Sequence, residues 1–106
     1  MAILEKKVET GIDERTKRII IGVISILFPT ARIILYGSRA RGDYKEKSDI
    51  DIAIDTGKRE EFVDIGEARN MLRESNILYN IDVVDVHIMP ESMRTDVIKE
   101  GIIWKN

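Results

Sequence analysis

The stretch of residues 33–55 limits what this chain can fold into, because it places two apolar segments around a short polar turn. Its second half alternates polar and apolar residues over positions 48–54, SDIDIAI. Successive side chains of a strand point to opposite faces of a sheet. We therefore expect Asp49 and Asp51 to project together from one face, while the isoleucines between and after them enter a core on the other.

The first half of the stretch ends an apolar segment with Gly37-Ser38. We predict a strand over residues 31–36 and a short helical turn over residues 38–43. A glycine lets the backbone approach a phosphate closely, and a Ser hydroxyl with the free N–H groups of a helix start can bind one. Paired carboxylates disfavour each other's ionisation, and Mg²⁺ removes that conflict while also binding substrate phosphates. The combination indicates metal-dependent nucleotidyl transfer.

The two motifs resemble the signature of a known superfamily. Gly37-Ser38, ten further residues and then Asp49-Ile50-Asp51 form the GS-x10-DxD pattern of the DNA polymerase beta-like nucleotidyltransferases. The strings LYGSRARG and SDIDIAID look like its smallest branch, the minimal nucleotidyltransferases (MNT), and the resemblance covers nearly the whole chain. It implies an α/β (α+β) nucleotidyltransferase fold, with a small mixed sheet and helices mainly on one face. The face that carries the two aspartates would then form an open active-site wall.

The resemblance also implies a role for each residue of the motifs. Asp49 and Asp51 would hold two Mg²⁺ ions, while Gly37 and Ser38 would bind the β- and γ-phosphates of ATP. Catalysis would come mainly from positioning and from charge neutralisation.

Two arginines lie in the turn that, by resemblance, wraps the nucleotide phosphates. These residues, Arg39 and Arg41, are two positions apart and so do not share a helix face. Each could contact a phosphate. Each could equally form a structural pair with Asp43 or Glu46, and the residues alone do not separate these two interpretations.

Two-metal phosphoryl transfer calls for a third carboxylate, and the strand predicted over residues 79–87 offers two. Asp82 and Asp85 are three positions apart and therefore face opposite sides of a strand. In the family that the chain resembles, the third acid lies early in the strand after the intervening helix, between apolar residues. That pattern favours Asp82 as a metal ligand that positions or deprotonates the acceptor hydroxyl. Asp85 remains the alternative.

The other predicted elements follow from periodicity and caps. A helix over residues 13–28 begins at a capping Asp13, ends at Pro29, and carries apolar residues at helical spacing. Its broad apolar surface either packs into the core or binds a partner. A second helix over residues 59–75 ends at Asn76 and is expected to bury four side chains: Phe62, Ile65, Met71 and Leu72.

The C-terminal part predicts one more helix and a short strand. Pro90 fits the first turn of the helix, Met93 and Val97 lie one turn apart on it, and Gly101 fits its C-terminal cap. Residues 102–104 would then cover the sheet edge or pair with another copy of the chain.

Length and composition narrow the function further. The 106 residues leave room for one domain, residues 1–106, with one core. Cysteine is absent and His87 is the single histidine, which excludes thiol nucleophiles and HExxH zinc sites. The net charge of −2 and pI of about 5.5 argue against direct nucleic-acid binding, despite short basic runs at Lys6-Lys7 and residues 15–18. Without an apparent signal peptide or spanning segment, we expect a cytoplasmic protein.

The larger enzymes of the superfamily add a domain for the base and the acceptor, so we expect something else to complete this site. By resemblance, the partner is an all-helical HEPN toxin in a toxin–antitoxin pair, and the MNT protein adenylylates a tyrosine on it. A second interpretation is an antitoxin that neutralises the HEPN partner by binding alone. A third is nucleotidyl transfer to a small molecule.

Overall fold

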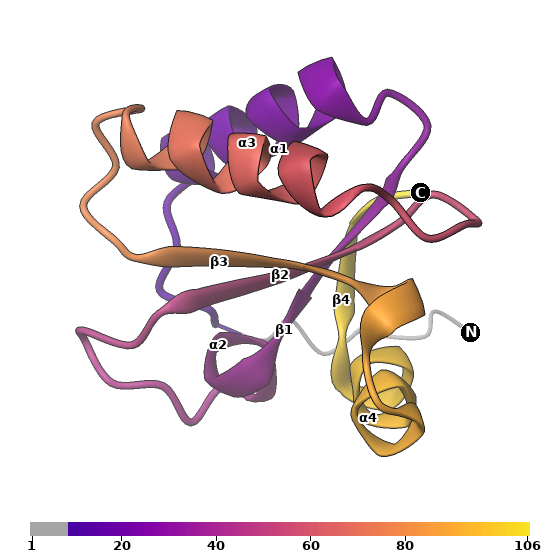
Figure 1. Cartoon of the computed structure of the whole chain (residues 1–106). Coiled ribbons are helices and arrows are strands. Elements are labelled where there is room, and N and C mark those ends of the chain that lie inside the picture. Colours follow the sequence, from indigo (N-terminus) through magenta and orange to yellow (C-terminus); the bar gives the residue numbers. More distant parts are fainter. Residues whose placement is uncertain (1–8) are drawn as a thin grey trace, which may run out of the picture.

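The computed structural model describes residues 9–106, so the basic pair Lys6-Lys7 lies outside the described part. Four strands form one mixed sheet in the order β3-β2-β1-β4 (Figure 1). The central strand β1 runs antiparallel to both β2 and β4, and β3 runs parallel to β2. The predicted small mixed sheet is confirmed. Its strands are β1 (Arg32–Tyr36), β2 (Ile50–Asp55), β3 (Ile81–Asp85) and β4 (Ile102–Lys105).

The two longest helices, α1 (Glu14–Leu27) and α3 (Phe62–Arg73), cover one face of the sheet (Figure 1). The short α2 (Gly37–Arg41) and the C-terminal α4 (Glu91–Glu100) lie on the other side, where a one-turn 3-10 helix η1 (Val86–Ile88) follows β3. This second face is only partly covered. A small apolar cluster joins α4 to it: Ile34, Ala53, Val86, Met89 and Val97.

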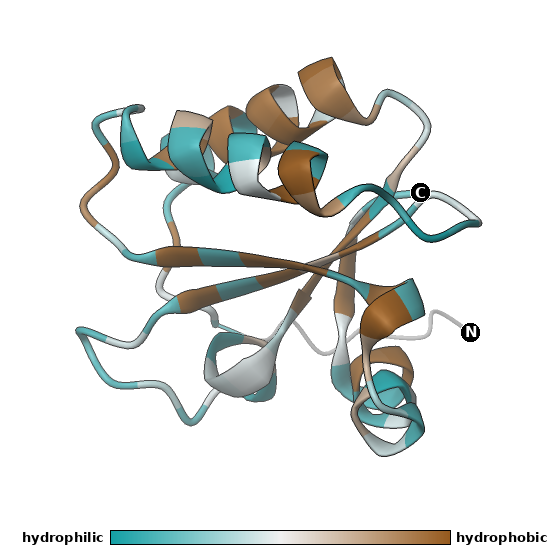
Figure 2. Cartoon of the chain, in the orientation of Figure 1, coloured by the Kyte–Doolittle hydropathy of each residue, from teal (hydrophilic) through white to brown (hydrophobic). Residues whose placement is uncertain are grey.

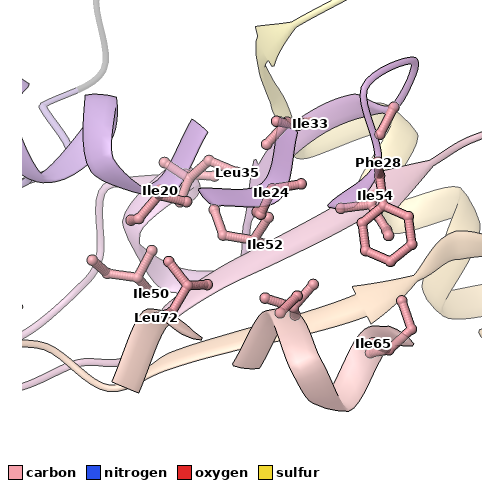
Figure 3. Close-up of a cluster of buried hydrophobic side chains, with 14 residues drawn as sticks. Ile20, Ile24, Phe28, Ile33, Leu35, Ile50, Ile52, Ile54, Ile65 and Leu72 are labelled. Atoms are coloured by element: carbon pink, nitrogen blue, oxygen red, sulfur yellow. The ribbon is translucent and has the colours of Figure 1, made fainter. Parts of the chain in front are cut away.

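The alternation predicted for β2 is present. Ile50, Ile52 and Ile54 are at most 1% exposed and pack against α1 and α3 in the main core (Figure 3). Burying each such side chain contributes about 1.5–3 kcal/mol. Asp51 and Asp55 have the opposite parity on the same strand and remain half-buried. The apolar core therefore determines which face the acidic residues occupy.

The first helix has the cap that the sequence predicts. Asp13 accepts hydrogen bonds from the Thr16 N–H at 3.4 Å and the Thr16 hydroxyl at 2.5 Å, and these bonds lower the pKa of the Asp13 carboxyl. Ile20 and Ile24 are fully buried, which supports the core-packing interpretation of this helix. Ile26, however, is 70% exposed and leaves an apolar side chain outside the core.

Two details of the predicted elements are wrong. Phe62 is the first residue of α3 and is 80% exposed, because the buried side of the helix runs through Ile65, Ala68 and Leu72. Phe62 is rotated about 60° from Ile65 in the direction opposite to Ala68, so it lies beyond the edge of the buried side. The strand predicted over residues 79–87 is also shorter, because the chain leaves β3 at Asp85 and turns into η1.

The C-terminal strand β4 covers one edge of the sheet, which is the first of the two alternatives predicted for residues 102–104. β4 pairs with β1 through Ile102 and Ile103. Gly101 joins α4 to β4 at a tight passage, where an added Cβ would meet the Val97 carbonyl and the Ile34 side chain. Among residues 9–106, no helix combines the length and the apolar character needed to cross a membrane.

Candidate active site

The acidic residues meet at the end of the sheet where β2 and β3 begin. Asp51 on β2 is the direct register partner of Asp82 on parallel β3, and Tyr36 on β1 is its partner on the other side. Register partners point to the same face, so the two carboxylates lie side by side. Asp49 has the same parity as Asp51 but lies one residue before the strand and is exposed.

The electrostatics of Asp51 reflect this crowding. Burial raises the pKa of its carboxyl, and the neighbouring charges of Asp82 and Asp49 raise it further, while Arg41 opposes them. Its ionised form is therefore destabilised in the protein alone. A cation bound between these oxygens would relieve the repulsion.

The two candidates for the third carboxylate occupy different environments. Asp85 is 1% exposed and accepts hydrogen bonds from the Glu60 N–H at 2.8 Å and the His87 N–H at 2.9 Å. It therefore caps η1 and holds the segment before α3. The Asp82 side chain is half exposed on the face that carries Asp51. Of the two, only Asp82 lies beside the other acidic residues.

The turn after β1 contacts the acidic residues directly. Gly37 has φ +75°, a conformation that favours glycine, and a Cβ added there would collide with the Asp51 carboxylate. Ser38 follows at the start of α2 and is half-buried. The Gly-Ser turn and the acidic pair are thus one continuous surface.

The structure assigns Arg39 to the framework rather than to a ligand. Its side chain is 1% exposed, and its guanidinium donates to three backbone carbonyls. These are Thr10 O at 2.9 Å, Glu46 O at 3.2 Å, and Ser48 O at 2.9 and 3.1 Å. The donors expected to contact a phosphate are engaged, so this geometry argues against the nucleotide-binding role expected for Arg39.

Aromatic rings complete the environment of this arginine. The Arg39 guanidinium lies 4.8 Å from the ring centroids of both Tyr44 and Tyr79. Cation–π contacts of this kind favour Arg and add to its hydrogen bonds. Because Ser48 immediately precedes Asp49, the cluster fixes the backbone from which the Asp49 carboxylate projects.

Arg41 has a different environment, on the surface. It pairs with Asp43 at 3.3 Å and with Glu100 at 3.6 Å, and all three side chains are substantially exposed. The bond to Asp43 is the main cause that raises the pKa of Arg41 above its ordinary value. Ion pairs at exposed positions contribute little to stability, so Arg41 can exchange these partners for a phosphate at little cost.

Two site residues were missed by the sequence analysis. Arg69 on α3 lies with Nε 3.4 Å from Asp82 Oδ1 and donates to the Val83 carbonyl at 2.8 and 3.1 Å. The sequence feature that could have identified Arg69 was its position one helical turn after the buried Ile65. Tyr36 borders Asp51, and burial together with the charges of Asp51 and Asp82 raises the pKa of Tyr36 to about 12.

The donor set fits a divalent cation that arrives with its substrate. Within residues 9–106, no three His, Asp or Glu side chains are grouped closely enough to form a metal cage by themselves. Mg²⁺ does not need one, because it uses one or two carboxylates together with waters and substrate phosphates. Asp51, whose ionised form is destabilised by burial and by its acidic neighbours, could supply the carboxylate. The adjacent Gly-Ser turn could hold the substrate phosphates.

A groove of about 850 Å³ opens beside the acidic residues. Asp49 and Asp82 form part of its wall, together with side chains from the end of α3 and from the loop before β3. The site therefore has two sides, with the Gly-Ser turn on one and the groove on the other.

The chain is similar to known proteins in sequence and in fold. Residues 22–105 match the family described as "Polymerase beta, Nucleotidyltransferase", a span that contains both motifs and all three acidic residues. No curated protein matches the chain.

Several solved structures share the fold. A toxin–antitoxin structure with AMP-PNP has a TM-score of 0.73 and 24% identity, covering 85% of this chain and 73% of that chain. A tri-AMPylated Shewanella oneidensis HEPN toxin in complex with MNT antitoxin has a TM-score of 0.69 and 21% identity, covering 88% and 72%. The toxin–antitoxin MntA-HepT has a TM-score of 0.70 and 21% identity, covering 89% and 74%.

Proposed function

This chain belongs to the polymerase beta nucleotidyltransferase family, and on that premise we propose that it transfers AMP from ATP to a protein hydroxyl. The acceptor is a HEPN-family toxin, with a tyrosine as the modified residue, and the chain acts as its antitoxin. The observation that carries this proposal is the Asp51–Asp82 pair lying against the Gly37 turn. Structures of similar fold that contain AMP-PNP, or an AMPylated HEPN toxin, support the choice of nucleotide and acceptor.

In this proposal the acidic residues and the turn bind the nucleotide together. Asp49, Asp51 and Asp82 would hold two Mg²⁺ ions, which neutralise charge on the phosphates when bound. Gly37 and Ser38 would bind the β- and γ-phosphates through backbone N–H groups and the Ser hydroxyl. Arg41 remains available as an additional phosphate contact.

The groups on the other side of the site act on the acceptor. Asp82 would orient the incoming hydroxyl and take its proton, because it lies on the boundary with the groove. The hydroxyl oxygen forms a bond to the α-phosphorus as the α–β phosphoanhydride bond breaks, and pyrophosphate leaves. Burial and the charges of Asp51 and Asp82 raise the pKa of Tyr36 to about 12 in the protein alone, so its hydroxyl is protonated at neutral pH and can donate a hydrogen bond.

A second candidate is an antitoxin that neutralises its partner by covering it. Five large apolar side chains of residues 9–106 support this alternative, because they are at least 70% exposed: Ile26, Phe62, Val63, Leu78 and Ile98. Exposed apolar side chains of this kind can form a protein interface. This function would need none of the clustered acidic residues.

A transfer assay distinguishes the two candidates. The protein is incubated with Mg²⁺, α-labelled ATP and a HEPN-family protein encoded beside it, in parallel with an Asp49→Ala/Asp51→Ala double variant. Asp96→Ala, an exposed carboxylate on α4, is the matched control. Label on the partner that is lost only in the double variant supports transfer. If a tight complex forms but no nucleotide gives label on the partner, the chain acts as an antitoxin that neutralises its partner by binding alone.

A further inference from the structure

The loops before β2 and β3 lie at the same end of the sheet (Figure 1), and residues of both loops line the groove. One loop precedes β2 and contributes Glu46, Lys47 and Asp49, and the other precedes β3 and contributes residues 77–80. The end of α3 closes the groove with Arg69 and Arg73. None of these groups has a role in binding the triphosphate in the function proposed above, apart from Asp49.

The order of the strands separates the groove from the phosphate side. Gly37 and Ser38 follow β1, Asp51 lies on β2, and Asp82 lies on β3 at the edge of the sheet. The groove is lined by Asp49 and Asp82 but not by Gly37, Ser38 or Asp51. A nucleotide bound at the Gly-Ser turn therefore leaves the groove open to a second substrate.

The groove carries charges of both signs, with three acidic and three basic side chains in its wall. The proposed function assigns Asp49 and Asp82 to Mg²⁺, which leaves Glu46 as the remaining acidic side chain of the lining. Arg69 already faces Asp82. Among residues 9–106, neither Lys47 nor Arg73 forms an ion pair, and both are exposed. These two cations are available to a carboxylate that enters the groove.

Apolar side chains lie beside these cations. Leu78 is 96% exposed, and it lines the groove with Ile77 and Leu72. Figure 2 shows this apolar section in the loop that leads into β3. A volume of about 850 Å³ falls within the range of about 300–1,000 Å³ that binds ligands larger than one side chain.

We infer that the groove binds the acceptor as a polypeptide segment in which a carboxylate and an apolar side chain flank the reactive hydroxyl. The carboxylate would pair with Arg73 and Lys47, the apolar side chain would contact Leu78, and the hydroxyl would reach Asp82. This inference rests on the proposed transfer of AMP to a protein. It adds the side of the site from which the acceptor enters and the chemistry that recognises it.

The test measures acceptor and nucleotide kinetics separately. Arg73→Glu and Leu78→Asp are made in the full chain, with Arg59→Glu and Ile98→Asp as controls of the same chemistry at exposed positions outside the groove. We expect the KM for the HEPN partner to rise about tenfold or more in each groove variant, the size typical of losing an important interface contact. The KM for ATP stays within about twofold, and Arg73→Lys retains most of the acceptor affinity.

The outcomes separate this inference from the proposed function. If the wild-type protein labels the partner and both groove variants keep the wild-type acceptor KM, the groove is not the acceptor site, while the transferase function stands. A rise in the KM for ATP alone would make the groove a nucleotide site and overturn the inference. If the wild-type protein transfers no label, both proposals fail. Because Arg73 and Leu78 are exposed, a thermal melt is expected to show unchanged folding in every variant.

Discussion

Asp51 and Asp82 are register partners on adjacent parallel strands, and each lies on the face opposite the isoleucine core. Two ionised carboxylates in this arrangement destabilise the folded protein, because burial and the charges of Asp82 and Asp49 raise the pKa of Asp51 above its ordinary value. A group whose pKa is raised on folding costs stability above that pKa. The acidic residues of the site therefore lower the stability of the folded protein at neutral pH.

Replacing Asp51 by Asn should raise thermal stability and abolish transfer. The neutral amide has nearly the same shape and removes the repulsion, so we expect the melting temperature at neutral pH to rise by a few degrees without Mg²⁺. Asp96→Asn, an exposed carboxylate in the middle of α4, is the control and should change neither property. A melting temperature that falls in Asp51→Asn would contradict the electrostatic account.

Gly37→Ala should damage both the fold and the site. The positive φ costs a side chain about 1–2 kcal/mol, and the new Cβ would collide with the Asp51 carboxylate. We expect a lower unfolding free energy by denaturant titration and at least a tenfold loss of transfer, about 1.4 kcal/mol in the barrier. Gly22→Ala is the matched control, because Gly22 lies in α1 with no atom within 4 Å of the added Cβ. That variant should gain about 0.5–1 kcal/mol.

Arg39→Lys should destabilise the protein although the charge is kept. Lysine cannot reproduce the fork that reaches Thr10, Glu46 and Ser48, nor stack as a plane between the two tyrosines. Hydrogen bonds to charged groups contribute about 1.5–3 kcal/mol each, so the loss should be about 2 kcal/mol or more in urea unfolding. Arg41→Lys, at the exposed pair, should cost much less stability than Arg39→Lys. Equal effects of the two substitutions would refute the framework role of Arg39.

Acid should weaken the fold partly through Asp55. The Gly57 N–H is the main group that lowers the pKa of Asp55 below its ordinary value of 3.8. His87, whose Nε2 lies 2.9 Å from Asp55 Oδ1, lowers this pKa further. A lowered pKa contributes stability that is present above the unfolded value and is lost as the pH falls through the folded one. Melting curves should therefore show that Asp55→Asn loses less stability than the wild type as the pH falls from about 5 through the lowered pKa of Asp55. An unchanged pH dependence in the variant would exclude Asp55 as a contributor.

Local patterns predicted much of this structure. Alternation placed Asp49 and Asp51 on one face, and the Asp13 cap and Pro29 delimited α1 within a residue at each end. Such features depend on residues that are close in the sequence, so periodicity and capping preferences predict them.

The remaining details depend on contacts between distant segments. The surroundings of Arg39 come from Thr10, Tyr44 and Tyr79, which converge only in the folded chain. Likewise, Asp85 is distinguished from Asp82 by a bond to the Glu60 N–H, and no sequence spacing encodes that contact. Phe62 was predicted to be buried from its helical phase, although the position where the helix begins decides its exposure.

The parallel pairing of β2 with β3 has a consequence for how such a protein can diversify. The separation of Asp51 and Asp82 is set by backbone hydrogen bonding between neighbouring strands, about 4.8 Å apart, and not by the loops around them. The loops before β2 and β3 can therefore change without altering the separation of Asp51 and Asp82, provided that the contacts of Arg39 with Glu46, Ser48 and Tyr79 are kept. Under the proposed function, the acceptor can thus change through these loops while the acidic pair stays in place.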